Sequence, residues 1–412
     1  MTPNTSHILN QGGTLRDHRF MRDVRLFIVP TVVAIVLQGA LYATLLRQAG
    51  RSDWLVPVAV IAGATILSAL MLTAFRRHQY PLTSSALLTA AMYCVAVTVL
   101  SALRIRVSYF GLTLAAPIAI GCLAYANMRF HKAISDNVAL LEFPGAQALA
   151  VSLGVPIAKE SDEIDQLLID PGEPTEPGQL NRYYMRGVEI VPWMLFLETR
   201  QGRVDVASFD ISHIRLSPTQ LLYTRAKRLL DILAVLVTLP ITVPLSLLVA
   251  GFILLRHGRP VLFIQKRFGY GGQHFSMMKF RTMHEGSEGH SAGVGDKRVF
   301  AGGRFLRRLR LDELPQLYNV LIGEMSLIGP RPVSDFVATQ CEATEPKYGL
   351  RYLVQPGITG WAQVNSGYAT TTEEEMRKLS FDLYYIKHQS FDLDLQIIFR
   401  TLLTLVLGKG AR

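Results

Sequence analysis

Residues 232–255 read ILAVLVTLPITVPLSLLVAGFILL, a long run without a single charged side chain. About 20 apolar residues are enough for a helix to cross the hydrocarbon core of a membrane, so this run is long enough to span it. Basic side chains flank the run on both sides: Arg225, Lys227 and Arg228 precede it, and Arg256, Arg259, Lys266 and Arg267 follow it. Because basic flanks favour the cytoplasmic face, the pattern predicts that both ends of the run stay in the cytoplasm.

Two prolines inside this run offer a way to bring both of its ends back to one face. Pro240 and Pro244 each remove a backbone donor and clash with the preceding turn, which bends or breaks a helix. We therefore predict a re-entrant membrane helix over residues 229–255, broken at Pro240 and Pro244. A straight span is the alternative, and it would place the polar remainder of the chain outside the cytoplasm.

Four further charge-free apolar runs lie upstream, at residues 26–46, 54–75, 82–103 and 107–128. Their length predicts a region of four transmembrane helices over residues 26–128, after a cytoplasmic N-terminal segment at residues 1–25. The first run lies too far in and is too long to be a signal-peptide core, so no cleaved segment is expected. Arg and Lys are more frequent at the two ends of the bundle and in its middle loop than in its other loops, which predicts that both ends are cytoplasmic.

The composition agrees with a membrane protein that carries folded polar parts. Half of the 412 residues are hydrophobic and 18% are charged, below the roughly 25% that is usual in soluble domains. The net charge of +10 favours an anionic partner, such as phospholipid headgroups, nucleotide phosphates or nucleic acid. The three cysteines, Cys94, Cys122 and Cys341, are widely spaced and indicate neither a metal site nor a disulfide framework.

Residues 129–222 are predicted to form a small cytoplasmic Rossmann-like α/β domain. Short apolar stretches such as residues 138–141 and 188–196 alternate there with turn-rich segments, and the acidic stretch at residues 160–176 is most simply a solvated loop. A dinucleotide-binding fingerprint would place glycines after the first strand, but Phe143-Pro144-Gly145 stands in that position. We therefore expect a structural or regulatory domain without a bound dinucleotide.

Two adjacent carboxylates stand out in the last predicted unit, residues 223–412. Asp312 and Glu313 follow the arginine-rich segment RFLRRLR at residues 304–310 and precede Leu314-Pro315. Proline suits the first position of a helix, so the pair should lie beside a helix N-terminus, where free N–H groups favour anions. One carboxylate of such a pair can attack phosphorus while its neighbour binds Mg²⁺. A solvated charged helix is the alternative interpretation of the same residues.

Other residues of this unit could bind the remaining parts of a phosphorylated substrate. The flanking prolines 330 and 332 restrict the backbone of Arg331, so its guanidinium can be presented to a phosphate with little loss of entropy. The segment around Trp361 combines glycines, an aromatic plane and amides that could take a nucleoside base, although a surface loop is equally compatible. No metalloprotease, nucleophile-elbow or P-loop motif is present, which leaves protease, esterase and P-loop ATPase functions without support.

Several of these segments together resemble a known family. From Lys227 to the C-terminus, the chain is similar to the polyprenyl-phosphate hexose-1-phosphate transferases, the monotopic phosphoglycosyl transferases. The matching runs are Lys227-Arg228-x-x-Asp231-Ile232, Lys279-Phe280-Arg281-Thr282-Met283, Leu311-Asp312-Glu313-Leu314-Pro315-Gln316-Leu317, Met325-Ser326-Leu327-Ile328-Gly329-Pro330-Arg331-Pro332, Pro356-Gly357-Ile358-Thr359-Gly360 and Asp382-x-Tyr384-Tyr385. With its upstream helices and α/β domain, the chain resembles the large branch that initiates exopolysaccharide, capsule or O-antigen synthesis.

The resemblance implies a reaction and roles for individual residues. A hexose-1-phosphate passes from a UDP-sugar to undecaprenyl phosphate through a covalent aspartyl intermediate, releasing UMP. Asp312 is then the nucleophile, and Glu313 helps to bind the cofactor Mg²⁺. The other site residues that we assign are phosphate partners at Lys279, Arg281, Arg307 and Arg331, and nucleotide- or sugar-binding residues at Gly357, Gly360 and Gln363.

The resemblance also implies a bacterial inner-membrane location, with the catalytic α/β domain facing the cytoplasm and no nucleic-acid partner. Pro244 matches the helix-breaking proline of the family, although Val243 stands where the family often has serine. Asn365-Ser366-Gly367-Tyr368 departs from the usual Ser-Gly-Arg ending, which leaves the donor sugar open. A homodimer is one expectation for the oligomeric state. The alternative functions are a non-catalytic scaffold of a polysaccharide assembly complex and a lipid phosphatase.

The end of the chain allows two interpretations. Residues 395–407 are apolar apart from Gln396, Arg400 and two threonines. This run is too short and too interrupted to span comfortably, so it predicts either a helix at the membrane interface or a core helix.

Overall fold

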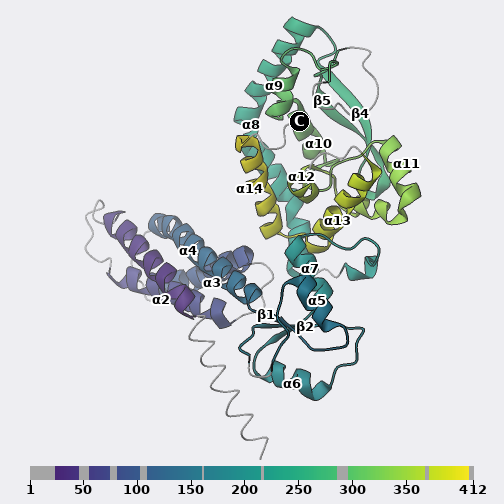
Figure 1. Cartoon of the computed structure of the whole chain (residues 1–412). Coiled ribbons are helices and arrows are strands. Elements are labelled where there is room, and N and C mark those ends of the chain that lie inside the picture. Colours follow the sequence, from purple (N-terminus) through teal and green to yellow (C-terminus); the bar gives the residue numbers. More distant parts are fainter. Residues whose placement is uncertain are drawn as a thin grey trace, which may run out of the picture. The chain divides into compact units, whose positions relative to one another are not determined.

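The computed structural model describes residues 24–45, 55–74, 81–102, 109–159, 162–214, 218–284, 296–366 and 371–407. The chain divides into two compact units, Met1–Leu197 and Glu198–Arg412, each of which is described by itself (Figure 1). The predicted N-terminal segment at residues 1–25 lies outside the described residues except for Val24 and Arg25. The loops that connect the four upstream apolar runs also lie outside them.

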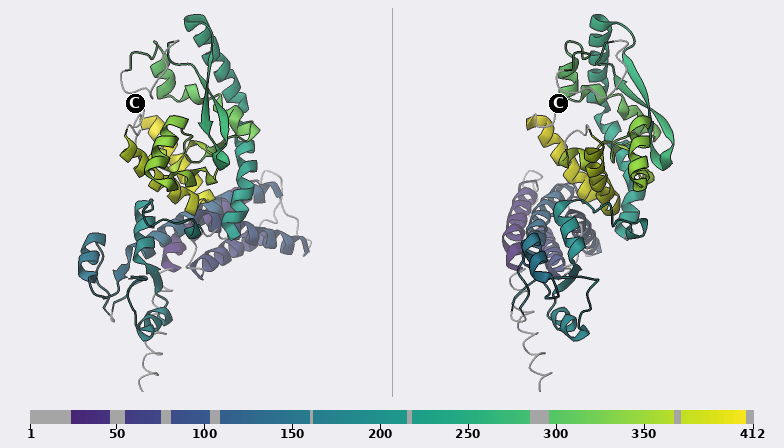
Figure 2. Two further views of the ribbon diagram at one scale, coloured as in Figure 1. Left: turned by 90° about the vertical axis from the view of Figure 1, so that its right-hand side faces the viewer. Right: turned by 45° about the vertical axis from the view of Figure 1, so that its right-hand side comes forward.

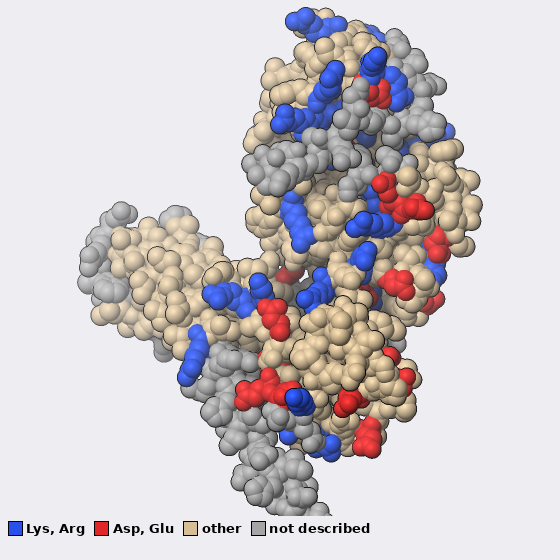
Figure 3. Space-filling model, viewed as in Figure 1, with Lys and Arg blue, Asp and Glu red and all other residues tan. Residues whose placement is uncertain are grey.

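The first unit begins with four helices where the sequence predicts four apolar runs. They are Val24–Leu45, α2 (Leu55–Ala74), α3 (Pro81–Ala102) and α4 (Tyr109–Asp136). Among the described residues, the first three of these helices and α8 of the second unit are long and apolar enough to cross a membrane. Helix α4 begins at Tyr109, within the fourth predicted run, and continues beyond that run to Asp136. The bundle surface visible in Figure 3 carries few charged side chains, as lipid contact requires.

Gln38 and Asn127 make hydrogen bonds between helices inside the bundle. The Gln38 amide donates to the carbonyl oxygen of Ala115 at 2.9 Å and to the Tyr93 hydroxyl, while the Thr65 hydroxyl donates to Gln38 Oε1 at 3.2 Å. The Asn127 amide makes similar bonds to Ser85 Oγ, at 3.1 Å, and to a backbone oxygen of α3. Such internal pairs suit helices whose surroundings offer no water as a partner.

The rest of the first unit is a small α/β domain, as predicted. Strands β1 (Val138–Leu140), β2 (Gln166–Ile169) and β3 (Glu189–Pro192) form a parallel sheet in the order β1-β2-β3. Helices α5 (Ala146–Leu153) and α6 (Pro177–Met185) connect these strands, and α7 (Trp193–Gln201) follows the last one. Parallel neighbours require such crossover connections. Gly145 stands before α5 in the left-handed conformation, with φ 88°, in the loop where a dinucleotide fingerprint is absent.

Helix α8 (Pro218–His257) is the longest element of the second unit, with 40 residues. It is continuous through Pro240 and Pro244, so the predicted break into two separate helices is corrected to one unbroken helix. A proline removes one backbone hydrogen bond and can bend a helix without ending it. The two views of Figure 2 show α8 running along the second unit.

Both ends of α8 are bound by the same unit. Near its start, the Arg228 guanidinium donates to the carbonyl oxygens of Val320 and Leu321, the latter at 2.7 Å. At its end, Arg281 Nη2 donates to the carbonyl oxygen of His257 at 2.6 Å. Because one unit holds both ends, the basic flanks of the apolar run lie on the same body.

The middle of α8 has one packed face and one exposed face. Val235 packs against Phe275 and Met277, and Ile253 packs against Phe300. The other face leaves many large apolar side chains exposed: Leu229, Leu230, Leu233, Leu236, Val237, Ile241, Val243, Leu247, Leu248, Leu254 and Leu255. An exposed apolar stripe of this size is typical of a surface that contacts lipid or protein.

The shorter elements of the second unit pack beside α8. Strands β4 (Leu262–Phe268) and β5 (His274–Phe280) form an antiparallel hairpin, with η2 (Tyr270–Gly272) at its turn, and β6 (Ser326–Ile328) pairs in parallel with β7 (Gly357–Thr359). The other elements in chain order are η1 (Ile211–His213), α9 (Gly303–Arg308), η3 (Leu311–Glu313), α10 (Gln316–Ile322), α11 (Asp335–Thr344), η4 (Pro346–Leu353), α12 (Trp361–Asn365), α13 (Thr372–His388) and α14 (Phe391–Leu407).

The sequence allowed a core helix or a helix at the membrane interface for residues 395–407, and α14 (Phe391–Leu407) has both a buried and an exposed apolar face. Leu393 and Ile397 on one face are buried in the largest core cluster of the second unit. Phe399, Leu402 and Leu403 are exposed. The helix is therefore amphipathic, with a core face and an apolar outer face.

Candidate active site

The carboxylate pair lies in a tight turn, η3, immediately before α10. Arg310 precedes the turn in the left-handed conformation, with φ 56°, and among the described residues it is the one non-glycine side chain with a positive φ. Such backbone is costly for a residue with a Cβ and is concentrated at functional sites. Pro315 caps α10, as its position in the sequence predicts. The turn places both Asp312 and Glu313 in the interior of the unit.

Glu313 is held by three cations. Its Oε1 accepts from Arg331 Nη2 at 2.9 Å and from Arg310 Nη1 at 3.2 Å, and it lies 4.0 Å from Lys279 Nζ. Burial would raise the pKa of Glu313, but the three cations outweigh burial and lower this pKa to about 2. Glu313 is therefore ionised at neutral pH, and its charge gathers the basic side chains around the turn.

Asp312 has a different environment. It is 8% exposed, and its Oδ1 is buried without a hydrogen-bond partner. Burial raises the pKa of Asp312 to about 6, and the neighbouring charge of Glu313 adds to the rise. An unpartnered buried carboxylate oxygen is costly, and a catalytic role or a bound ion is among the explanations for such an atom in a native structure.

Two of the predicted phosphate partners approach this pair from other elements. Lys279 extends from β5, and burial, together with the charge of Arg331, lowers its pKa to about 8. Arg307 of α9 lies close enough to lower the pKa of Asp312 by its charge. Figure 3 shows Lys and Arg side chains gathered over the upper part of the second unit, where α9 lies. The surroundings of the carboxylates are thus strongly basic, an environment that favours phosphate groups.

A buried ion pair between Arg351 and Asp382 holds the backbone of Arg331. The sequence did not indicate this contact. Arg351 Nη2 donates to the carbonyl oxygen of Arg331 at 3.0 Å and to Asp382 Oδ2 at 2.8 Å, and the Arg351–Asp382 pair is almost fully buried. The Tyr348 hydroxyl also bonds to Arg351. The loop that carries Arg331 is therefore held at its backbone as well as at its side chain.

The glycines assigned to nucleotide or sugar binding serve the packing of this loop. A Cβ at Gly357 would lie 2.0 Å from the backbone nitrogen of Gly329, and a Cβ at Gly360 would lie 2.1 Å from the Gly329 carbonyl oxygen. The Gly329 nitrogen donates to the carbonyl oxygen of Thr359 at 2.9 Å. The backbone at Gly329 thus passes too close to the backbone at Gly357 and Gly360 for any of them to carry a side chain. This close packing is sufficient to account for the glycines, and no ligand is needed to explain them.

Two further predicted residues are not brought to the carboxylate pair. Arg281 donates to the backbone oxygens of His257 and Gly258, so it binds the end of α8 rather than facing a phosphate. Gln363 Nε2 donates to the carbonyl oxygen of Ile358 at 3.0 Å, while its Oε1 is buried without a partner. The structure therefore gathers Asp312, Glu313, Lys279, Arg307 and Arg331, and adds Arg310, whose role the sequence did not indicate.

The oxygen atoms of the carboxylate pair are chemically suitable ligands for Mg²⁺. Among the described residues, no three His, Cys, Asp or Glu side chains lie together as a complete protein cage. Mg²⁺ commonly uses one or two carboxylates together with substrate phosphates and water. The unpartnered Oδ1 of Asp312 beside Glu313 supplies donors of that kind.

A buried carboxylate pair among lysine and arginine side chains, on a body that holds an apolar helix at both ends, defines a membrane-associated enzyme of phosphate transfer. The family described as bacterial sugar transferase matches residues 222–408. The chain belongs to this family. Its matched region contains α8 except for the first four residues of that helix, together with the carboxylate pair and the basic residues around it.

Several curated proteins are similar to part of this chain. The chain is 43% identical over 218 residues to the UDP-N-acetylgalactosamine-undecaprenyl-phosphate N-acetylgalactosaminephosphotransferase of Aeromonas hydrophila, covering 52% of each protein. It is 42% identical to the UDP-glucose:undecaprenyl-phosphate glucose-1-phosphate transferase of Caulobacter vibrioides, covering 45% of this chain and 71% of that relative. The enzyme of the same description from Xanthomonas campestris is 36% identical over 278 residues, 65% of this chain and 55% of that protein. The chain therefore spans about half the length of several relatives that it matches.

Proposed function

We propose that this protein transfers a hexose-1-phosphate from a UDP-sugar to undecaprenyl phosphate, giving undecaprenyl-diphosphate-hexose and UMP. The observation that carries the proposal is the pair of unlike carboxylates. Asp312 has a buried oxygen without a hydrogen-bond partner, and Glu313 beside it is bound by three cations. A nucleophile needs a free oxygen, and a diphosphate needs cations, so the turn η3 offers both in one place.

In the first half-reaction, a carboxylate oxygen of Asp312 attacks the phosphorus that bears the sugar. The bond from this phosphorus to the bridging oxygen breaks, and UMP leaves with that oxygen. A phosphosugar remains as an acyl phosphate on Asp312. In the second half-reaction, a phosphate oxygen of the polyprenyl phosphate attacks the same phosphorus, and the carboxylate of Asp312 is released.

The basic side chains carry the electrostatic part of this mechanism. Lys279, Arg307 and Arg331 would contact the negatively charged oxygens of the donor, and Arg331 can use its planar fork for two of them. Glu313 keeps these cations close together before the donor binds. Mg²⁺ bound by Glu313, with the unpartnered oxygen of Asp312 nearby, would neutralise part of the diphosphate charge.

The acceptor and the membrane geometry follow from α8. The exposed apolar face of this helix supports insertion into the bilayer. The binding of both its ends by one unit supports the predicted topology, in which both flanks stay on the cytoplasmic side. We assign the protein to the bacterial inner membrane with the carboxylate pair on the cytoplasmic side. The named relatives act with different sugars, so they support the reaction class and the undecaprenyl acceptor but leave the hexose open.

A covalent adduct tests the proposed function directly. The wild-type protein, incubated with a panel of UDP-sugars and Mg²⁺ but without polyprenyl phosphate, should release UMP and gain the mass of one hexose phosphate. Mass spectrometry after rapid quenching should place the adduct on the peptide that contains Asp312. Addition of polyprenyl phosphate should then remove the adduct and form the sugar-linked lipid. A protein without any adduct or lipid product would be a scaffold, and release of inorganic phosphate from a lipid phosphate would indicate the phosphatase.

The re-entrant arrangement predicts the same accessibility for both flanks of α8. In a variant without the native cysteines, single cysteines introduced near Arg225 and near Arg259 should both be protected from a membrane-impermeant thiol reagent applied to intact cells. Both should react after the cells are opened. Labelling of the second position alone in intact cells would show that α8 is a straight span with the catalytic unit outside.

A further inference from the structure

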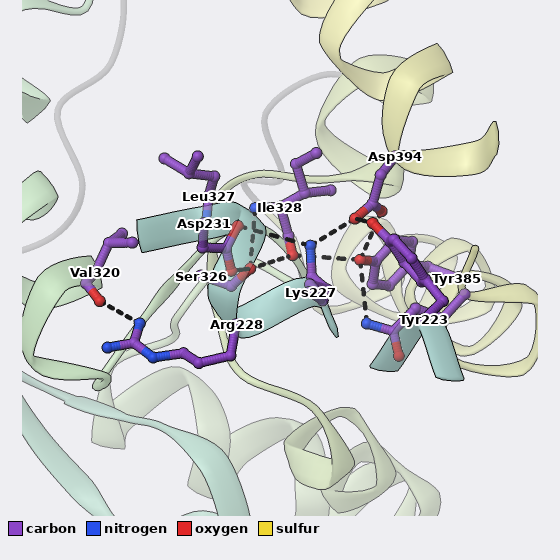
Figure 4. Close-up of polar contacts among 11 residues, drawn as sticks. Tyr223, Lys227, Arg228, Asp231, Val320, Ser326, Leu327, Ile328, Tyr385 and Asp394 are labelled. Atoms are coloured by element: carbon purple, nitrogen blue, oxygen red, sulfur yellow. Dashed lines mark hydrogen bonds and ion pairs between the residues drawn. The ribbon is translucent and has the colours of Figure 1, made fainter. Parts of the chain in front are cut away.

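One turn of α8 carries a sequence motif that the proposed reaction does not use. Lys227, Arg228 and Asp231 belong to the Lys-Arg-x-x-Asp segment, and all three point toward other elements of the second unit (Figure 4). Lys227 is 8% exposed and Asp231 is 4% exposed, although both are charged residues at the start of an otherwise apolar helix. Burial of charged groups is costly unless they are paired, so their partners indicate what the turn does.

Lys227 binds α8 to the C-terminal helices. Its Nζ lies 2.5 Å from Asp394 Oδ2 on α14, and Tyr385 of α13 donates to Asp394 Oδ1 at 2.8 Å. The Tyr223 hydroxyl, one turn earlier on α8, donates to the same carboxylate. This side of the cluster attaches the helix to α13 and α14.

Asp231 binds α8 to the strand that leads into the active site. Its Oδ2 accepts from the Ser326 hydroxyl at 2.7 Å, and its Oδ1 faces the backbone nitrogen of Leu327 at 3.4 Å. Ser326 is buried in strand β6, which ends three residues before Arg331. Tyr385 donates to the carbonyl oxygen of Ile328, at 3.3 Å, and so holds the end of the same strand.

Arg228 binds the element that follows the carboxylate pair. Its guanidinium donates to the carbonyl oxygens of Val320 and Leu321 at the end of α10, the helix that starts three residues after Glu313. The same turn of α8 therefore holds the strand before Arg331 and the helix after Glu313. Arg331 and Glu313 are themselves joined at 2.9 Å, so the turn fixes both sides of that contact from the outside.

We propose that Asp231 is a positioning residue that sets the place of Arg331 relative to the carboxylate pair, through Ser326 and strand β6. This inference rests on the proposed function, in which Arg331 binds a donor phosphate. It also links the membrane helix to the active site, because the aspartate that holds β6 belongs to α8 itself. Asp231 touches no substrate in this role and acts through Arg331.

A double-mutant cycle with UDP as the probe tests the proposal. Binding of UDP to the purified full-length protein is measured by calorimetry for the wild type, Asp231→Asn, Arg331→Ala and the double variant. We expect the Kd for UDP to rise about 10-fold or more in Arg331→Ala, which removes a charge-assisted bond, and about 3- to 10-fold in Asp231→Asn. Because Asp231 acts through Arg331, the double variant should bind no more than about twofold more weakly than Arg331→Ala alone.

Tyr223→Phe is the matched control, since it removes a hydrogen bond of the same cluster on the side of Asp394 and none to β6. It should leave the Kd for UDP within about twofold of the wild type. Ser326→Ala provides a second variant if Asp231→Asn folds poorly, and it should show the same lack of additivity with Arg331→Ala. Additive losses in both cycles, or an equal loss in Tyr223→Phe, would overturn the proposal. A wild-type protein that forms no UDP complex would instead remove the proposed function, and this inference with it.

Discussion

Asp312→Asn is expected to abolish transfer, with kcat lower by about 10⁴-fold or more, because the amide keeps the shape of the side chain but has no anionic oxygen to attack phosphorus. The variant should release no UMP from a UDP-sugar and should form no covalent adduct. Asp312 is buried beside Glu313, so asparagine fits the same volume, and the apparent melting temperature should stay close to that of the wild type. The measurements are UMP release, adduct mass and thermal unfolding on the same preparation.

Glu313→Gln is the matched control for that variant. It removes the neighbouring charge and leaves the nucleophile in place, so it should still form the adduct, more slowly and with a higher Mg²⁺ requirement. Turnover by Asp312→Asn at a rate similar to that of Glu313→Gln would show that another group attacks the donor. An adduct found on a different peptide would lead to the same conclusion.

Gly357→Ala is expected to destabilise the second unit strongly. A Cβ at this position would lie 2.0 Å from the Gly329 nitrogen and 2.5 Å from the Thr359 carbonyl oxygen, and backbone atoms cannot move aside as a flexible side chain can. Overpacking of this kind costs about 3 kcal/mol, which corresponds to a melting temperature lower by about 6–12 °C for a unit of this size. Thermal unfolding in detergent micelles measures the difference.

Gly349→Ala serves as the control in the same unit, because no atom lies within 4 Å of its added Cβ. Its free energy of unfolding should change by no more than about 0.5 kcal/mol. If Gly357→Ala unfolds at the wild-type temperature but no longer binds UDP, the glycine contributes to ligand binding, as the sequence first suggested. Equal losses in both variants would show that the close backbone crossing is not the cause.

The sequence was most informative where chemistry and local geometry coincide. Asp312 and Glu313 could be found because two carboxylates follow several arginines and precede a proline that starts a helix. Their different environments could not be found in the same way. The unpartnered oxygen of Asp312 and the three cations on Glu313 depend on side chains from β5 and from the Arg331 loop, which no local pattern brings together.

Residues that act through long-range contacts were predicted less well. Asp382 belongs to a matching motif, but its pairing with Arg351 joins α13 to η4 and becomes visible only in the folded unit. Gly357 and Gly360 were assigned to nucleotide or sugar binding because the sequence does not show that their backbone crosses that of Gly329. Arg281 was assigned from the family resemblance. It follows directly after the last residue of β5, and its guanidinium donates to the carbonyl oxygens of His257 and Gly258 at the end of α8.

For α8, the composition of the sequence correctly predicted a long apolar helix but did not correctly predict the path of its backbone. The basic flanks predict that both ends of the run stay in the cytoplasm, and this stays a prediction. Arg228 and Arg281 bind those ends within the second unit. The prolines suggested a break, yet the helix continues through both of them. Proline removes local hydrogen bonds, but packing along Val235 and Ile253 stabilises the helix on both sides of that interruption.

The attachment of α8 at both ends has a consequence for how the two substrates meet. Under the proposed function, the nucleophile cannot drift away from the bilayer, because the body that carries Asp312 is fastened to the inserted helix before and after the apolar stretch. The polyprenyl carrier diffuses in the plane of the membrane, with its phosphate at a nearly constant height. Its search for the enzyme is then two-dimensional, and the encounter rate follows the surface density and lateral mobility of the carrier. The soluble nucleotide sugar diffuses through the bulk solution. The first half-reaction therefore depends on the bulk concentration of the donor, whereas the second depends on the surface density of the carrier in the membrane.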